Sequence, residues 1–131
     1  MNKQELQKRI KNLAVQTARL CMNLSTNLIN RIYTGQLVRC SSSAAANYRA
    51  ACRGKSKADF VHKLRVVEEE LDETMFFYEM LAEFNPASKS ELRTLYKEAD
   101  ELLSIMVASI NTTNKNIEKE KSAKKNPKSP I

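Results

Sequence analysis

The sequence has few of the residues that form turns in β-rich proteins. Its 131 residues include only two glycines and three prolines, and there is no tryptophan. Because glycine and proline supply most of the tight turns between short strands, this scarcity excludes a β-rich fold and favours long helices with few connections. The length fits a single domain whose core needs no disulfide or metal to hold it together.

Side chains suited to covalent or metal chemistry are also sparse. The chain has three cysteines, Cys21, Cys40 and Cys52, and one histidine, His62. The cysteines are odd in number, have no C-x-x-C spacing and lie among apolar helical positions, as expected for small buried side chains in a reducing compartment. No Ser-His-Asp set, Cys-His pair or glycine-rich phosphate loop can be assembled. We therefore expect no catalytic residues, no cofactor and no enzymatic activity.

A metal centre is the remaining catalytic alternative. Di-iron sites in helical bundles need glutamates from two helices and a Glu-x-x-His step from each of two others. Asp59 and His62 form one such step without a second, so a metal enzyme would require several subunits to pool ligands around His62. The acidic residues that follow share one helical arc, which is typical of a solvated face: Glu68, Glu69, Asp72, Glu79 and Glu83.

Long hydrophobic runs are absent as well. No stretch approaches the roughly 18 uncharged apolar residues of a membrane span, and the first twelve residues, MNKQELQKRIKN, are polar. We expect a cytoplasmic protein without membrane contact.

What the sequence does contain is four segments with apolar residues at alternating spacings of three and four, the pattern of packed helices. The predicted helices run from about Gln4 to Ile32, from Gln36 to Arg53, from the Ser56 cap to Asn85-Pro86, and from the Ser88 cap to about Asn116. Gly35 is expected to cap the first helix and Gly54 to end the second. The predicted core positions are Leu6, Ile10, Leu13, Thr17, Leu20 and Leu24; Leu37, Cys40, Ala44, Tyr48 and Ala51; Phe60, Leu64, Val67, Leu71, Thr74, Tyr78 and Leu81; Leu92, Leu95, Ala99, Leu102 and Met106.

Four long helices with short connections predict an all-α, antiparallel, up-down-up-down four-helix bundle over residues 1–116. From Ile117 onward the sequence EKEKSAKKNPKSPI has no apolar period and carries five lysines against two glutamates. Such a composition does not offset the entropy of ordering. Residues 117–131 are therefore predicted to form a disordered, lysine-rich tail.

Charge is unevenly distributed along the chain. The formal net charge is +7, and the segment from Gln36 to Phe60 holds five basic residues with no acid before Asp59. On a helix, Arg39, Arg49 and Arg53 fall within an arc of about 80°. Such a strip can neutralise phosphates with salt-dependent affinity, and the tail would add mobile contacts. The nucleic-acid-binding candidates are Arg39, Arg49, Arg53, Lys55 and Lys57. Alternatively, the arginines pair with the glutamate-rich third helix of the same or an adjacent subunit.

The third and fourth helices carry more apolar residues than one core seam requires. Surplus apolar stripes predict subunit contacts, whereas wide core faces are the equally weighted alternative. Glu70 and Glu73 lie beside these residues and could pair with arginines of another subunit. The subunit-interface candidates are Val66, Glu70, Glu73, Phe77, Phe84, Tyr96 and Leu103.

Several short stretches carry a family resemblance: Gln36-Leu37-Val38-Arg39, then Ser43, Ala46-Asn47, and Lys55-Ser56-Lys57 leading into Phe60, with Leu71 and Glu73 after them. They resemble a bacterial four-helix-bundle family, historically labelled ribosomal-protein-like, known from intervening sequences within large-subunit ribosomal RNA genes. A related branch contains the accessory variability proteins of diversity-generating retroelements, which form barrel-shaped homopentamers and bind nucleic acid and a reverse transcriptase.

The resemblance implies a left-handed antiparallel bundle that assembles as a homopentamer, with Gln36 and Asn47 as family-motif packing positions and no catalytic residues. It also implies nucleic acid, or a protein such as a reverse transcriptase, as partner. Where an Asn-Ile-Ala-Glu-Gly run is usual, this chain has Asn47-Tyr48-Arg49-Ala50-Ala51, so the acid and glycine are missing and an arginine appears. A role of that glutamate is therefore not carried over.

These observations lead to one principal hypothesis, a non-enzymatic homo-oligomer, expected to be a pentamer, that binds nucleic acid, with RNA as the expected class. The alternative is a protein-interaction scaffold or accessory protein whose charged faces serve subunit or partner contacts.

Overall fold

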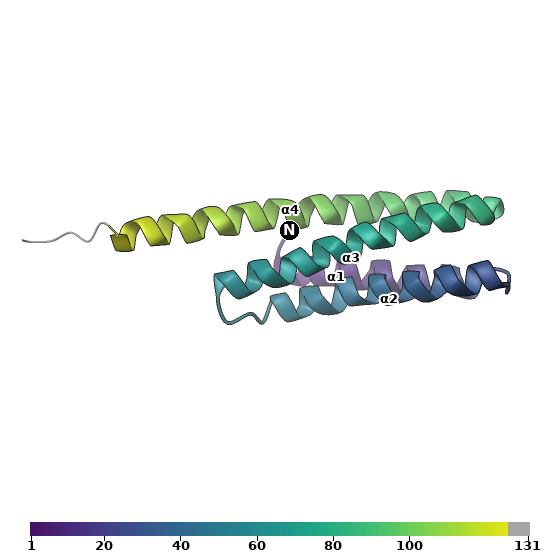
Figure 1. Cartoon of the computed structure of the whole chain (residues 1–131), viewed down its shortest axis with the longest axis horizontal. Helices are drawn as coiled ribbons and strands as arrows, with labels where there is room; N and C mark the ends of the chain where they lie inside the picture. The colour runs from purple at the N-terminus through teal and green to yellow at the C-terminus, as the bar shows by residue number, and fades with distance from the viewer. Residues whose placement is uncertain (126–131) are drawn as a thin grey trace, which may run out of the picture.

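Helices account for nearly all of residues 1–125, the part of the chain that the computed structural model describes. The order is α1 (Lys3–Met22), α2 (Leu28–Ala51), α3 (Lys57–Phe84), a short 3-10 helix η1 (Pro86–Ser88) and α4 (Lys89–Lys125). Residues 1–125 contain no strand. Consecutive helices run in opposite directions and lie side by side (Figure 1). The predicted all-α four-helix bundle is confirmed; its left-handed twist stays a prediction.

The first helix boundary differs from the prediction. The chain leaves helical conformation after Met22 and re-enters it at Leu28, so a helix through Ile32 and a cap at Gly35 are both wrong. The physical reason is the capping residue Asn27 at the end of the segment Asn-Leu-Ser-Thr-Asn: its side chain caps α2 by accepting a hydrogen bond from the backbone N–H of Asn30 at 2.8 Å. Gly35 lies inside α2 and does not have a positive φ.

The second boundary was predicted more closely. Helix α2 ends at Ala51, and Ser56 caps α3 by accepting a hydrogen bond from the backbone N–H of Asp59 at 3.1 Å. Little space is left beside Gly54 in the turn between them. A Cβ atom at this position would lie 2.9 Å from Oδ2 of Asp59 and 3.0 Å from the carbonyl oxygen of Ala51. A side chain here would push the Asp59 carboxylate aside and crowd the Ala51 carbonyl, so the turn packs closely against Gly54.

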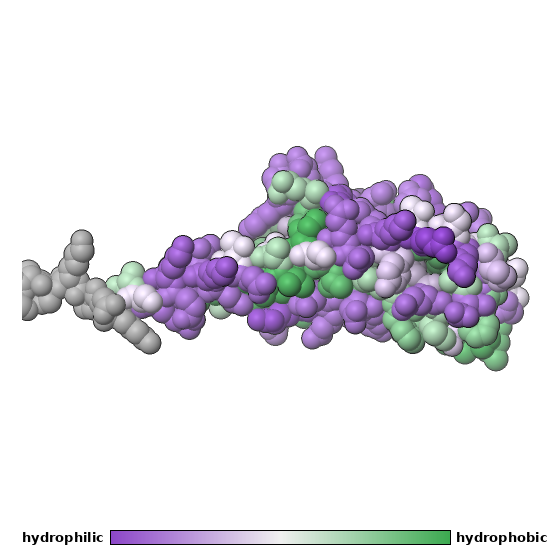
Figure 2. Space-filling view, turned by 90° about the horizontal axis from the view of Figure 1, so that it is seen from above, coloured by the Kyte–Doolittle hydropathy of each residue, from purple (hydrophilic) through white to green (hydrophobic). Residues whose placement is uncertain are grey.

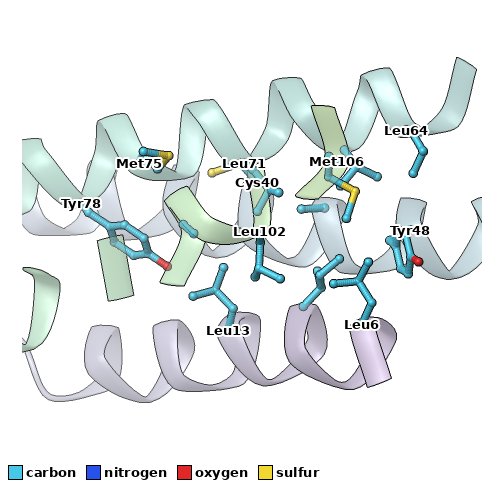
Figure 3. Close-up of a cluster of buried hydrophobic side chains, with 14 of the residues drawn as sticks. Leu6, Leu13, Cys40, Tyr48, Leu64, Leu71, Met75, Tyr78, Leu102 and Met106 are labelled. Carbon is cyan, nitrogen blue, oxygen red and sulfur yellow. The ribbon is translucent and has the colours of Figure 1, made fainter. Parts of the chain in front are cut away.

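The core confirms the predicted helix faces almost throughout. Side chains from all four helices point into one interior (Figure 3). Of the predicted core residues only Leu24, Phe60 and Leu95 are partly buried. The two threonines in the register are fully buried, and the hydroxyls of Thr17 and Tyr78 are 2.6 Å apart, which satisfies both polar groups inside the core. Arg9 joins α1 to α4 through a hydrogen bond from its Nε to Glu98 at 3.1 Å.

Helix α4 continues past Asn116 as far as Lys125, so it includes the first part of the segment that was predicted to be a disordered tail. Two contacts explain why it extends: Ile117 packs against the core, and Glu120 pairs with Lys57 at the start of α3. In Figure 1 the end of α4 projects beyond the other helices. The remainder of the predicted tail, residues 126–131, lies outside the described residues.

The three turns between helices are divided between the two ends of the bundle. The α1–α2 and α3–α4 turns share one end, and the α2–α3 turn lies at the other, on the side toward which α4 projects (Figure 1).

None of the described helices has a stretch that is both long and apolar enough to span a bilayer.

Candidate nucleic-acid interface

A groove of about 1280 Å³ lies between α1 and α2. The groove forms because both helices carry small side chains where they face each other. These side chains extend little beyond their Cβ atoms and so leave the space between the helices open. The small side chains that line the groove, which we call its floor, are Ala14, Ala18, Ser42, Ala45, Ala46 and Ala50, and Val15 lies among them.

Basic side chains surround this groove. Lys8 and Lys11 come from α1, and Arg49 and Arg53 come from α2. The turn after α2 and the first turns of α3 add two more, Lys55 and Lys63. Asp59 is the single acidic residue among those that line the groove. We call this feature the basic groove.

Asp59 is neutralised by its neighbour. Nζ of Lys63 lies 2.7 Å and 2.9 Å from the two carboxylate oxygens of Asp59, and this hydrogen-bonded pair holds the pKa of the carboxyl below its ordinary value. The remaining five cations of the basic groove make no ion pair within residues 1–125: Lys8, Lys11, Arg49, Arg53 and Lys55. The groove therefore concentrates positive charge that the described part of the chain leaves uncompensated.

The structure divides the predicted basic strip. Arg49, Arg53 and Lys55 line the basic groove, but Arg39 faces α3. Its Nη1 lies 3.3 Å from Oε2 of Glu70, its Nη2 pairs with Glu73, and its Nε donates to Gln36 at 3.0 Å.

Lys57 is likewise occupied, because it pairs with Glu120 of α4. The alternative in which an arginine pairs with the glutamate-rich helix of its own subunit therefore holds for Arg39. Of the five predicted residues, three remain available to an anionic ligand.

Three basic residues of the groove were missed from the sequence, namely Lys8, Lys11 and Lys63. Lys8 and Lys11 lie one turn apart on the same side of α1 as Ala14 and Ala18. That stripe of lysines followed by alanines was a readable signal, but only the packing of α1 beside α2 shows that it faces Arg49.

The two family-motif positions make their hydrogen bonds within α2. Nδ2 of Asn47 donates to the carbonyl oxygen of Ser43 at 2.9 Å and to its hydroxyl at 3.0 Å. Gln36 accepts its hydrogen bond from Arg39. Within the described part of the chain, Gln36 therefore orients the guanidinium of Arg39, and Asn47 makes its hydrogen bonds to Ser43 of its own helix.

The predicted interface residues comprise five apolar side chains and two glutamates, and the structure places them differently. Val66, Phe77, Tyr96 and Leu103 are half-buried, whereas Phe84 is 53% exposed. Glu70 and Glu73 are engaged by Arg39 within one subunit.

Phe84 belongs to a cluster of neighbouring aromatic rings. The ring of Tyr33 lies 6.1 Å from those of both Phe77 and Phe84, and Phe76 packs edge-on against Phe77 at 5.2 Å. Figure 2 shows hydrophobic side chains gathered at the end of the molecule opposite the projecting part of α4. The exposed apolar residues near this end, which we call the end patch, are Met22, Leu28, Ile29, Ile32, Phe76 and Phe84.

The cysteines are free thiols in the described part of the chain. Burial raises the pKa of the Cys21 thiol to about 11 and also raises that of Cys40, so both stay protonated at neutral pH. Residues 1–125 contain no group of three or more His, Cys, Asp or Glu side chains that could hold a metal ion.

Comparisons with known proteins agree with this architecture. A family model described as 23S rRNA-intervening sequence protein matches residues 2–108. A crystal structure of a protein of unknown function from the S23 ribosomal protein family of Bacteroides thetaiotaomicron superposes with a TM-score of 0.75 at 22% sequence identity, covering 85% of this chain and 99% of that one. At this identity the superposition shows a shared fold. The search of curated proteins finds no match.

Proposed function

Because this chain belongs to the 23S rRNA-intervening sequence protein family, we propose that it is a non-enzymatic nucleic-acid-binding protein whose ligand is RNA and whose binding surface is the basic groove. One observation carries the proposal: five cations converge on the groove without an ion-pair partner within residues 1–125. A phosphate backbone supplies the anions that such a surface lacks, and each neutralised phosphate releases a condensed counterion.

The end of α4 supports the same ligand. This segment projects on the side of the α2–α3 turn, which carries Arg53 and Lys55 (Figure 1). Lysines are its commonest charged residues, and those from Lys115 to Lys124 are exposed to solvent. Because Glu120 pairs with Lys57, the extension is held near the turn, where it can add contacts to a strand that leaves the basic groove.

Salt-dependent RNA binding tests this proposal. The affinity of the full chain for a labelled RNA is measured by fluorescence anisotropy between about 50 and 200 mM salt, where five phosphate contacts predict a log–log slope on the order of −4. Arg49→Ala should weaken binding and reduce that slope by about 1. Arg39→Ala is the matched control, because Arg39 already pairs with Glu70 and Glu73 and should change neither value.

The proposal fails if the full chain binds no RNA at the lowest salt concentration. It also fails if Arg39→Ala and Arg49→Ala weaken binding equally, because general attraction to a positive surface would then account for the affinity.

We further propose that copies of the chain associate, and that the number of copies is five, as the resemblance to the accessory variability proteins implies. The observation that favours association is the end patch, where Ile32, Phe76 and Phe84 are each at least half exposed. Exposed apolar side chains gathered in this way mark interaction surfaces on soluble proteins. An acidic partner protein on the charged faces is the competing function.

A further inference from the structure

We infer that the basic groove takes the sugar–phosphate backbone of one strand of an RNA duplex and recognises it without reading the bases. This inference rests on the proposed function and narrows it, because it specifies the form of RNA and how the RNA is held.

The composition of the groove argues against single strands. Proteins that hold single-stranded nucleic acid stack its bases on aromatic side chains, each worth about 1–3 kcal/mol. None of the residues lining the basic groove in the described chain is aromatic. Tyr48, which is close in sequence to Arg49, is only 3% exposed and points into the core (Figure 3). An unpaired strand would therefore leave its bases without a platform, whereas a duplex keeps them stacked on one another.

The shape of the groove suits a backbone ridge. Lys8 and Lys11 flank it on one side, and Arg49 and Arg53 flank it on the other. Each pair is separated by about one turn of its helix, roughly 5 Å along the axis. Because the residues between them are Ala and Ser side chains with one valine, Val15, a protruding row of phosphates can enter and be neutralised from both sides.

Uncharged polar groups along the groove favour RNA over DNA. Gln4, Gln7 and Ser42 line it, and their side chains make no hydrogen bond to another residue in the described part of the chain. A 2′-hydroxyl can donate to or accept from all three, and such contacts are how proteins distinguish A-form RNA by its backbone. Neither an amide nor a hydroxyl in this position requires a particular base.

A second copy of this chain is the competing occupant, because the solvent-exposed acids of α3, such as Asp72 and Glu79, complement the same charges. A helix of that copy would offer no 2′-hydroxyls to Gln4, Gln7 and Ser42, however, whereas an RNA backbone supplies both these hydroxyls and the phosphates. The observations therefore favour RNA, and the test separates the two.

The test fills the floor without changing charge. Ala46 is exposed within the groove, so Ala46→Leu should fold, and Ser42→Leu provides a second filling variant. Ala87→Leu is the matched control, because Ala87 is also exposed but lies in η1 near the end patch. Affinity is measured by anisotropy for a labelled RNA duplex of about 16 base pairs, for each of its strands alone, and for the DNA duplex of the same sequence. Circular dichroism verifies the helical content of every variant.

We expect the RNA duplex to bind more tightly than either strand or the DNA duplex, and a duplex of unrelated sequence to bind equally well. Ala46→Leu and Ser42→Leu should weaken duplex binding by about tenfold, equivalent to about 1.4 kcal/mol, while Ala87→Leu has no effect.

Preference for a single strand, or duplex affinity unchanged by both filling variants, would overturn the inference and leave the proposed function standing. Absence of binding to any nucleic acid at low salt would overturn both. If the filling variants lower the solution mass without changing RNA affinity, the groove holds a second copy of the chain and the inference is wrong.

Discussion

The side-chain amides of Asn30 and Asn85 hydrogen-bond to each other in both directions, at 2.9 Å and 2.8 Å. Each uses its second N–H on a backbone carbonyl, that of Ser25 for Asn30 and that of Leu81 for Asn85. Asn30 is only 2% exposed. This pair connects the α1–α2 turn to the α3–α4 turn and thus holds together the end of the bundle that carries the end patch.

Removing one member of this pair should destabilise the fold. Asn85→Ala leaves the buried amide of Asn30 without its partner, and an unsatisfied buried polar group costs about 1–3 kcal/mol. Urea denaturation monitored by circular dichroism measures the change in the free energy of unfolding. Asn47→Ala is the control, because Asn47 is half-buried and bonds only within α2, so its loss should be smaller. Equal losses would show that the Asn30–Asn85 pair has no special role.

The two glycines should respond to alanine in opposite directions. Gly35 lies within α2, and a Cβ there would meet nothing within 4 Å, so Gly35→Ala should stabilise the protein by about 0.5–1 kcal/mol. Gly54→Ala should destabilise it, because the new Cβ would lie 3.0 Å from the carbonyl oxygen of Ala51 and would displace the Asp59 carboxylate. Thermal unfolding of both variants measures the two shifts. Stabilisation by Gly54→Ala would contradict the close packing of this turn.

Stability should fall at alkaline pH. Burial raises the pKa of the Cys21 thiol from 9.0 to about 11, and it also raises that of the Tyr78 phenol. Between the unfolded and folded values the unfolded chain has released a proton that the folded chain keeps, so the free energy of unfolding decreases as pH rises. This stabilisation is fully present below pH 9 and is lost as pH rises toward 11 and beyond.

Urea denaturation at a series of pH values from 7.5 to 11 follows this loss, and Cys21→Ala should make the decline shallower because one of the groups is removed. A decline of the same steepness in Cys21→Ala would exclude Cys21 as a contributor.

The end patch should control association. Light scattering of the full chain measures its mass in solution, which we expect to be several times that of one chain. The double variant Ile32→Ser/Phe84→Ser should reduce this mass, since both side chains are at least half exposed and neither belongs to the buried core. Ile29 lies in the same patch but is less exposed, so Ile29→Ser serves as a weaker comparison. If neither the change at Ile32 and Phe84 nor Ile29→Ser lowers the mass in solution, the subunit contact lies elsewhere.

The errors in sequence reading have a local physical origin. Gly35 looked like a helix cap because glycine readily adopts the left-handed conformation, but a helix tolerates a glycine at a cost of about 1 kcal/mol. The capping hydrogen bond of Asn27 and the burial of Asn30 favour a break at residues 23–27 instead. Similarly, Ile117 looked isolated in a polar tail, and its contact with the core became visible only once α4 was placed beside α3.

The helical class and the buried face of each helix follow from the order of residues alone, because the 3.6-residue turn converts spacing directly into a face. The sequence also identified Arg49, Arg53 and Lys55 as candidates for binding an anion. Which cations act together, by contrast, is set by the packing of the helices. Arg39 was separated from them by Glu70 and Glu73, and Lys8 and Lys11 joined them across a groove. Such groupings depend on how helices pack against one another. The spacing of residues within one helix does not show which residues of another helix will lie beside them.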